Sequence, residues 1–374
     1  MRWLAVLALL LPPTRPTRSN SPQFDFGYYN AEHSLDEVAP HSTTAMVGTG
    51  LNFSCYWSDS EACITEAAER DVATLRRLKA RNMTGVLAGA DDFFRWNATN
   101  TQPMSCTIAA DGPSRWRRYW SIVRPHAGSI LALYPLDEPP HCWPPTGAFA
   151  SMVKAIKAAT PELPMVAVLN PSFALGLGSG AYSLPPEIDW VGFDEYGCWN
   201  QSAATGGGPA CYKGVSYPEK LQMVDDWVHK HGKKLVVVAD AHYGAGWGPG
   251  LPDKALPNAT VQQDMARMAE LLFEYCAGNP RCVAMFPFLW GSVPACCAGA
   301  SQMPTLRATL SRIGSAVKQR RVHGALRPAA RVRFDAPALA VPQQPKFGLM
   351  WPDGDHPVDY SKCALLLCAR GCCP

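Results

Sequence analysis

Residues 130–140 read Ile-Leu-Ala-Leu-Tyr-Pro-Leu-Asp-Glu-Pro-Pro, an apolar run that ends in two adjacent carboxylates, Asp137 and Glu138. The apolar half has the length and composition of a strand that is buried on both faces. Acidic side chains that directly follow such a strand lie at its carboxyl end, where parallel α/β sheets place their active sites. The stretch therefore predicts a parallel strand whose carboxyl end carries chemistry.

Seven further apolar runs resemble this one, and amphipathic helical patterns lie between several of them. The predicted strands are 24–30, 45–53, 85–90, 130–136, 165–170, 189–193, 235–239 and 282–290. Helical spacing of apolar residues is found in 65–81, 218–230, 260–276 and 305–318. Eight strands interleaved with helices indicate an α/β fold of the (β/α)8 TIM-barrel type. The alternative, an open doubly wound sheet, would be expected to carry Gly-x-Gly-x-x-Gly after its first strand, and this chain does not.

The ends of the chain differ in composition from the predicted barrel. Met1 and Arg2 precede a short apolar run, which predicts a secretory signal peptide over 1–20. The barrel is expected over 21–319. Residues 320–345 are rich in Pro, Ala and Arg and are predicted to form a linker, and 346–374 to form a short disulfide-rich tail.

The signal is consistent with two other features of an exported chain. Fourteen cysteines, an even number, suit an oxidising compartment. Five Asn-x-Ser/Thr sequons occur, at Asn52, Asn82, Asn97, Asn200 and Asn258. We therefore expect a secreted or secretory-lumen glycoprotein that acts as a monomer.

Charge and hydropathy narrow the class of partner. After the signal, no apolar run is long enough to form an integral membrane segment. Eight Lys or Arg residues lie between Arg307 and Phe334 with no acid among them. In an exported chain we interpret this basic stretch as a solvated tail or a contact with a polyanionic surface rather than a nucleic-acid site.

Acidic, amide and aromatic residues recur at the predicted strand ends, all on the face where a barrel has its mouth. They are Asp92, Asp137, Glu138, Asn170, Asp194, Glu195, Tyr196, Asp240, His242, Tyr243 and Trp290. Clustered carboxylates beside aromatic rings suit cleavage of glycosidic bonds, because one acid must stay protonated while a second is ionised. The rings could stack on sugars. The sequence thus predicts a carbohydrate substrate, an oligosaccharide or polysaccharide, with no cofactor and no metal.

A Glu-Pro at the end of the fourth strand of such a barrel resembles the large clan of retaining (β/α)8 glycoside hydrolases. In that clan the acid/base Glu follows strand four, the nucleophilic Glu ends strand seven, and a Trp commonly ends strand eight. The resemblance implies that Glu138 is the acid/base and that Trp290 forms the floor of a sugar subsite. Asp240 stands where the clan has its nucleophilic Glu, and Asp137 where it often has Asn.

The identity of the second carboxylate stays open between Asp240 and Asp194. Asp is one methylene shorter than Glu, so the separation of roughly 5 Å needed for retention would require closer strands, whereas a wider gap would give inversion. The remaining strand-end residues are candidates for substrate binding: Asp92, Asp137, Asn170, Glu195, Tyr196, His242, Tyr243 and Trp290.

Three alternatives remain beside the two-carboxylate hydrolase. Asp137-Glu138 is similar to the Asp-Glu pairs of substrate-assisted N-acetylhexosaminidases, in which the Asp positions the acetamido group and the Glu is the acid. Asp240 and His242, with Asp194 and Glu138, could ligate a divalent cation in a metal-dependent hydrolase. A non-catalytic carbohydrate-binding barrel would keep the aromatic residues but not the acid chemistry.

The cysteines are expected to staple the loops. The predicted pairs are Cys55–Cys63, Cys106–Cys142, Cys198–Cys211 and Cys276–Cys282.

Overall fold

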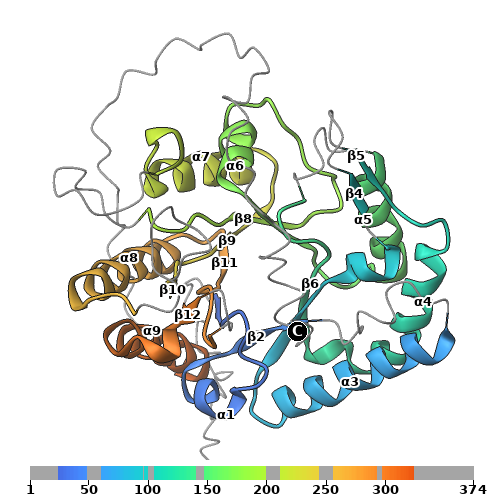
Figure 1. Cartoon of the computed structure of the whole chain (residues 1–374), viewed down its shortest axis with the longest axis horizontal. Helices are drawn as coiled ribbons and strands as arrows, with labels where there is room; N and C mark the ends of the chain where they lie inside the picture. The colour runs from blue at the N-terminus through green and yellow to red at the C-terminus, as the bar shows by residue number, and fades with distance from the viewer. Residues whose placement is uncertain are drawn as a thin grey trace, which may run out of the picture.

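The computed structural model describes residues 24–48, 60–95, 97–99, 105–139, 147–198, 211–243, 256–292 and 297–323. Within these ranges eight parallel strands form a ring, and helices surround it (Figure 1). The ring strands are β1 (Asp25–Phe26), β2 (Thr44–Gly48), β3 (Thr84–Ala88), β6 (Ile130–Tyr134), β7 (Val166–Leu169), β8 (Trp190–Phe193), β9 (Lys234–Val237) and β11 (Cys282–Met285). Each falls inside or within a residue of its predicted range, so the predicted barrel is confirmed.

Hydrogen bonds join the strands into a closed ring. One sheet has the order β2-β3-β6 and the other the order β1-β11-β9-β8-β7. A parallel bridge between Leu133 and Met165 connects β6 to β7. At the other seam the Thr43 amide donates to the Phe26 carbonyl at 2.8 Å. Gly27 permits this approach, because a Cβ there would lie 2.2 Å from the Thr44 carbonyl oxygen.

Alternation along the strands divides the core into two parts. Side chains on one face of each strand fill the inside of the barrel, and those on the other pack against the helices. In β9, for example, Val236 belongs to the inner cluster, whereas Leu235 and Val237 belong to the outer one. The buried inner cluster consists of Met46, Val86, Ala88, Ala132, Tyr134, Val166, Val168, Val236, Val238, Ala284 and Phe286. The barrel is therefore a packed core, and chemistry is confined to its ends.

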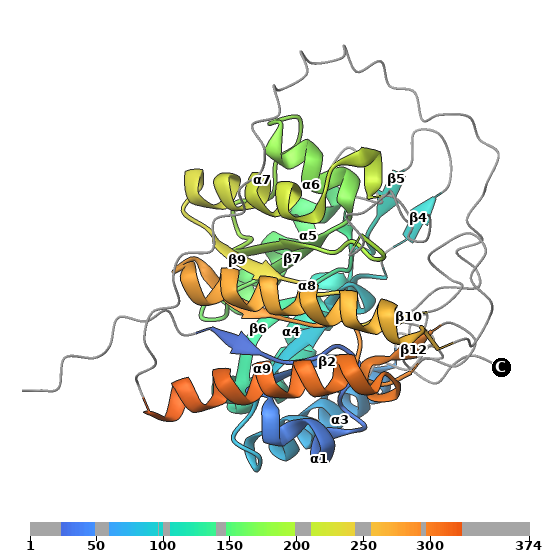
Figure 2. The same cartoon turned by 90° about the vertical axis from the view of Figure 1, so that its left-hand side faces the viewer.

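Helices form the outer layer (Figure 2). Four were predicted, and they are α3 (Glu61–Lys79), α7 (Tyr217–Lys230), α8 (Ala259–Gly278) and α9 (Pro304–His323). The α9 helix extends past the predicted barrel boundary at 319. Three more were not predicted: α4 (Gly112–Val123), α5 (Gly147–Ala159) and α6 (Pro171–Gly178). Each contains Gly near an end or inside it, and tertiary packing overrides that weak local preference.

Short elements complete the described part of the chain. The helix α1 (Leu35–Val38) and the 3-10 turn η1 (Ala39–His41) join β1 to β2, and η2 (Ala90–Phe94) follows β3. Three further 3-10 turns are η3 (Arg124–Ser129), η6 (Tyr212–Gly214) and η8 (Ala300–Gln302). Two small antiparallel pairs lie at the carboxyl end of the barrel: β4 (Asn97–Thr99) with β5 (Ser105–Thr107), and β10 (His242–Tyr243) with β12 (Ala298–Gly299) (Figure 2).

Two of the predicted disulfides are present, Cys198–Cys211 and Cys276–Cys282. Cys55 and Cys142 lie outside the described residues, so the other two pairings stay predictions. The same holds for the signal peptide, the linker and the tail. In the described ranges no helix combines the length and apolarity needed to cross a membrane.

Candidate functional site

Two carboxyl groups meet at the mouth of the barrel. Glu138 follows β6, the fourth strand of the ring, and Asp194 follows β8, the sixth. Their side chains are hydrogen-bonded to each other. Asp194 is buried, with 6% of its surface exposed, whereas Glu138 and the neighbouring Asp137 are half-buried. The pair therefore presents one carboxyl group toward solvent and holds the other beneath it.

The surroundings of Asp194 favour its protonated form. Burial is the largest cause, and the negative charges of Glu138 and Asp137 add to it, so the pKa of Asp194 is raised well above its ordinary value of 3.8. A hydrogen bond from the Tyr196 hydroxyl to Asp194 Oδ2, 2.7 Å long, opposes this shift only in part. Asp194 therefore keeps its proton at pH values where an exposed Asp has already lost it.

Three tyrosines surround the carboxyl groups. The Tyr134 hydroxyl donates a hydrogen bond to Asp137 Oδ1, and Tyr196 donates to Asp194. Tyr29, which follows β1, is hydrogen-bonded to Tyr134 and lies near Asp137. Burial, followed by these negative neighbours, raises the pKa of all three phenols well above 10.0. The tyrosines therefore stay protonated and act as hydrogen-bond donors at the mouth.

The backbone at Glu138 is in an unusual conformation. Its φ angle is +40°, in the left-handed region that side chains other than Gly rarely adopt. Pro139 follows directly and further restricts the backbone of the residue before it. Conformations of this kind cost on the order of 1–3 kcal/mol and persist where the surrounding structure holds them, often at functional sites.

Asp240, the predicted partner from the seventh strand, contacts other groups. Its Oδ2 accepts a hydrogen bond from the Gly197 amide at 2.7 Å, and its Oδ1 accepts from the His242 amide at 3.2 Å. The His242 Nδ1 atom lies 3.0 Å from the same Oδ1. Asp240 thus links the end of β9 to the segment after β8, and the carboxyl group bonded to Glu138 is that of Asp194.

The ring of His242 lies at the edge of the same cluster. Its centroid is 4.5 Å from that of Tyr196 and 5.2 Å from that of Phe288, both edge to face. His242 is buried, and Tyr243 after it is half-buried. The backbone pairing of β10 with β12 holds both residues in place.

Two predicted ligand-binding side chains, those of Glu195 and Asn170, are hydrogen-bonded within the protein itself. Glu195 is 6% exposed, and its two oxygens accept hydrogen bonds from Lys220 Nζ at 2.9 and 2.7 Å. The Asn170 Oδ1 atom accepts from the Phe173 amide at 3.0 Å and so caps α6. Asp92, which is also buried, lies in η2.

Trp290 requires a correction. Its side chain is only 2% exposed, and its Nε1 donates to Glu37 Oε2 at 3.1 Å. The ring packs against Tyr28 and His41, with centroids 4.8 and 5.3 Å apart. No face of the indole is open for a sugar, so the predicted floor of a subsite is wrong.

Sequence reasoning missed two residues of this cluster, Tyr29 and Tyr134. Both could have been found from the rule already applied to the other strands. Tyr29 stands at the end of the first predicted strand, and Tyr134 lies in the predicted strand that leads to Glu138, where alternate residues point to the inside of the barrel. Apart from its position in the strand, nothing in the sequence distinguishes an aromatic residue at the site from one in the core.

The acidic and histidine side chains at the mouth bear on the metal-dependent alternative. Within the described ranges, no three His, Cys, Asp or Glu side chains come together in a group that could hold a metal ion. Asp240 and His242 form a neighbouring pair.

No protein-family model and no curated protein matches the sequence. Solved structures of similar fold include xylanases, among them xylanase 10B from Thermotoga petrophila RKU-1 in complex with xylobiose. This one is 9% identical, over 79% of this chain and 94% of that chain, with a TM-score of 0.48. A GH10 xylanase from Thermobacillus composti is 13% identical over 78% and 97%, with a TM-score of 0.49. Native xylanase 10B from Thermotoga maritima is 10% identical over 80% and 97%, with a TM-score of 0.46. At these identities and scores the likeness says nothing about activity.

Proposed function

We propose that this chain is a glycoside hydrolase that cleaves O-glycosidic bonds by general acid/base catalysis, with Glu138 and Asp194 as its carboxyl pair. The observation that carries the proposal is the direct hydrogen bond between these two carboxyl groups at the barrel mouth, together with the raised pKa of Asp194. Glycosidic cleavage needs an acid that keeps its proton near neutral pH, and burial beside another carboxyl group provides one.

The two carboxyl groups have different roles. Glu138 is half-buried and faces the mouth, so it is the group that meets the glycosidic oxygen. Asp194 lies deeper and keeps its proton. Glu138 delivers a proton to the leaving oxygen as the bond to C1 breaks, and it then accepts a proton from the water that attacks C1. Asp137, held by Tyr134, is placed to accept a hydrogen bond from the sugar.

A narrower candidate is a substrate-assisted N-acetylhexosaminidase. Retaining enzymes with their own nucleophile separate the two carboxyl groups by about 5 Å, and inverting enzymes by about 6.5–9.5 Å to admit a water. Carboxyl groups in direct contact leave no room between them for an attacking water, so the wide inverting geometry does not apply. The nucleophile would then be the carbonyl oxygen of the substrate's 2-acetamido group, which attacks C1 while Glu138 protonates the leaving oxygen. Asp194 or Asp137 would accept the amide N–H.

The first experiment tests the acid role. Wild type, Glu138→Gln and the control Glu162→Gln, which changes an exposed acid distant from the mouth, are assayed on a panel of 4-methylumbelliferyl glycosides. We expect Glu138→Gln to lower kcat by about 10²–10⁴-fold, the usual contribution of a general acid, with an unchanged circular dichroism spectrum. Normal turnover by a folded Glu138→Gln variant would refute the proposal.

The second experiment tests the narrower candidate. Substrate assistance requires the acetamido oxygen, so 2-acetamido glycosides should be cleaved and the matching 2-hydroxy glycosides should not. Replacing the acetyl group by trifluoroacetyl weakens that oxygen as a nucleophile and should lower kcat. Equal rates on acetamido and hydroxy sugars would restrict the proposal to ordinary two-carboxylate chemistry. The metal-dependent alternative is tested by addition of a chelator, because a chelator would stop such a hydrolase.

We also infer that the protein is made in the secretory pathway and carries N-linked glycans. Of its sequons, Asn82 and Asn258 are exposed at the surface. Expression in mammalian cells should place the protein in the medium, and treatment with a peptide N-glycosidase should reduce its mass. Retention of an unglycosylated chain inside the cells would contradict the inference.

A further inference from the structure

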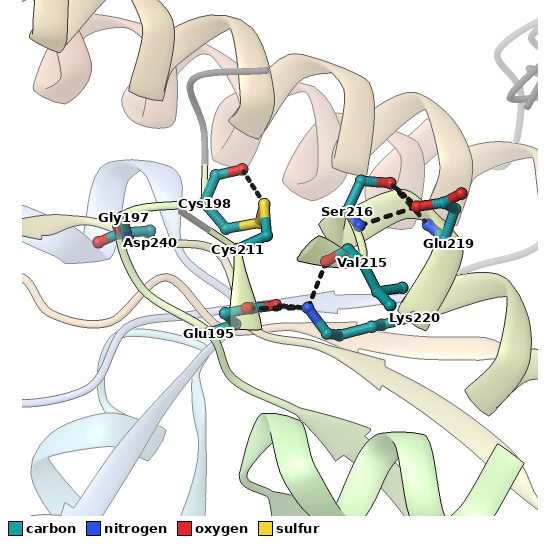
Figure 3. The surroundings of a disulfide bond; sticks show 9 residues. All are labelled: Glu195, Gly197, Cys198, Cys211, Val215, Ser216, Glu219, Lys220 and Asp240. Atoms are coloured by element: carbon teal, nitrogen blue, oxygen red, sulfur yellow. Dashed lines mark hydrogen bonds and ion pairs between the residues drawn. A yellow bond between two sulfur atoms is a disulfide. The ribbon is translucent and has the colours of Figure 1, made fainter. Parts of the chain in front are cut away.

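Behind the carboxyl pair, a fully buried lysine holds the segment that carries Asp194. The Lys220 side chain has no exposed surface, and its Nζ donates to both carboxylate oxygens of Glu195, at 2.9 and 2.7 Å, and to the Val215 carbonyl at 2.5 Å (Figure 3). An ammonium group has three hydrogens, and here three acceptor atoms surround it. Glu195 lies between Asp194 and Tyr196, the two residues whose side chains reach the mouth.

We propose that Lys220 is a positioning residue: by holding Glu195, it fixes Asp194 and Tyr196 in place against Glu138. For its catalytic consequence the proposal rests on the proposed function. Asp194 and Tyr196 bond to each other at 2.7 Å. Glu195, between them in the sequence, bonds instead to Lys220 of α7 (Figure 3).

Two more contacts fasten the same segment on its far side. The Gly197 amide donates to Asp240 Oδ2 at 2.7 Å, and Cys198 is disulfide-bonded to Cys211 (Figure 3). The segment is thus tied at three residues. Glu195 is bonded to Lys220 of α7, Gly197 to Asp240 after β9, and Cys198 to Cys211 in the loop before α7. Such fastening is expected where a side chain must stay in one position for chemistry.

The placement of Lys220 is itself determined by the start of its helix. Ser216 caps α7, and Glu219 completes a capping box by accepting from the Ser216 amide at 2.8 Å. This cap places Lys220 in the first turn of the helix, beside the end of β8. Loss of the ion pair would remove the bonds that tie Glu195 to α7 and, through Lys220, to the Val215 carbonyl. A shift of the segment that loses these bonds separates Asp194 from Glu138.

The test uses the double substitution Lys220→Met with Glu195→Gln, which removes both charges and keeps the side chains close to their original size. Its matched control is Lys157→Met with Asp189→Asn. That ion pair, 2.8 Å long, joins the residue before β8 to α5 at the opposite end of the same strand. Two quantities are measured: the titration of the Asp194 carboxyl carbon by ¹³C NMR, and kcat with its pH profile on the 4-methylumbelliferyl glycoside that wild type cleaves fastest.

In the double variant we expect the pKa of Asp194 to fall toward that of an ordinary carboxyl group. We also expect kcat to fall about 10- to 100-fold, the effect of a small displacement of a reacting group. The control variant should keep both quantities. If the double variant does not fold, Glu195→Gln alone, which retains Lys220 and its bond to Val215, gives the same comparison. A folded variant with an unchanged Asp194 titration would overturn the proposal. If the wild type cleaves no glycoside, the proposed function is refuted. The titration of Asp194 in the variants still tests whether Lys220 holds Asp194 in place.

Discussion

Asp194 lies where a carboxylate is difficult to form. It is buried, and Glu138 and Asp137 lie close to it. The folded protein therefore keeps the proton of Asp194 at pH values where the unfolded chain has lost it. Between 3.8 and the raised pKa the unfolded state binds fewer protons than the folded state, so stability falls as the pH rises through this window. The proton of Asp194 is in this way held at the expense of stability near neutral pH.

Replacing Asp194 by Asn should remove that pH dependence. The slope contributed by one such group is about 1.4 kcal/mol per pH unit, so the Asn variant should unfold at a higher denaturant concentration than wild type at pH 7. It should lose most of its activity at the same time. The measurement is urea denaturation from pH 4 to pH 8. A variant that is less stable than wild type at neutral pH would contradict the assignment.

Asp225 is the matched comparison with the opposite sign. Hydrogen bonds from Arg281, Tyr275 and Asn279 outweigh its burial and lower its pKa below 3.8. Its contribution to stability is present above 3.8 and is lost as the pH falls through the lowered value. Asp225→Asn should therefore destabilise the protein at neutral pH, whereas Asp194→Asn stabilises it.

At the scale of the element, the start of α7 shows how a local sequence signal serves a distant site. Ser216, Pro218 and Glu219 form the pattern expected at a helix start, and the capping box is present. The helix that begins there carries Lys220, which bonds to Glu195 beside the candidate site. A feature that can be read in four residues thus determines where a buried cation lies.

Ser216→Ala should lower the free energy of unfolding by about 1 kcal/mol, because the cap of α7 loses its hydrogen bond. Urea denaturation measures the change. Ser121→Ala is the control, since Ser121 is exposed in the last turn of α4 and its hydroxyl donates to the Arg118 carbonyl instead of accepting from a helix amide. There the higher helix propensity of Ala should leave stability equal or slightly greater. A loss of equal size in both variants would mean that the box contributes nothing of its own.

At the scale of the whole molecule, the last described helix closes the fold against the first strand. Gly314 in α9 lies so close to η1 that a Cβ there would be 1.9 Å from the His41 carbonyl oxygen and 2.7 Å from the Phe26 ring. This contact joins residues almost at opposite ends of the described chain. The barrel is therefore sealed by backbone approach, which only Gly permits.

The Gly314→Ala substitution tests this close packing, because the sign of its effect on the free energy of unfolding depends on whether the added Cβ has room. In a free helix Ala would add about 1 kcal/mol of stability over Gly. Here overpacking should reverse the sign and cost about 1–3 kcal/mol, measured as a fall in the urea midpoint. Gly128→Ala, at an exposed position with no atom within 4 Å of the added Cβ, is the control. Stabilisation by Gly314→Ala would mean that α9 does not pack this closely.

Much of the fold could be predicted because it depends on local patterns. Each ring strand is a short apolar run, and four of the helices have a clear apolar face, so the number and order of the strands were evident. The helices α4, α5 and α6 were missed because Gly and Pro at their ends obscure the pattern. Trp290 was misjudged for a different reason. A strand-end aromatic residue looks the same in sequence whether its ring faces the mouth or, as here, packs behind the strands.

The sequence alone was sufficient for the barrel and for Glu138 at the end of its fourth strand, because periodicity and chain order determine both. The partner of Glu138 depended on the tertiary structure. Asp194, Glu195 and Asp240 all stand at strand ends, and their order along the chain does not tell which of them reaches across the mouth. Closure of the ring and the contacts of Glu195 with Lys220 and of Asp240 with Gly197 decide it, and they leave Asp194 bonded to Glu138.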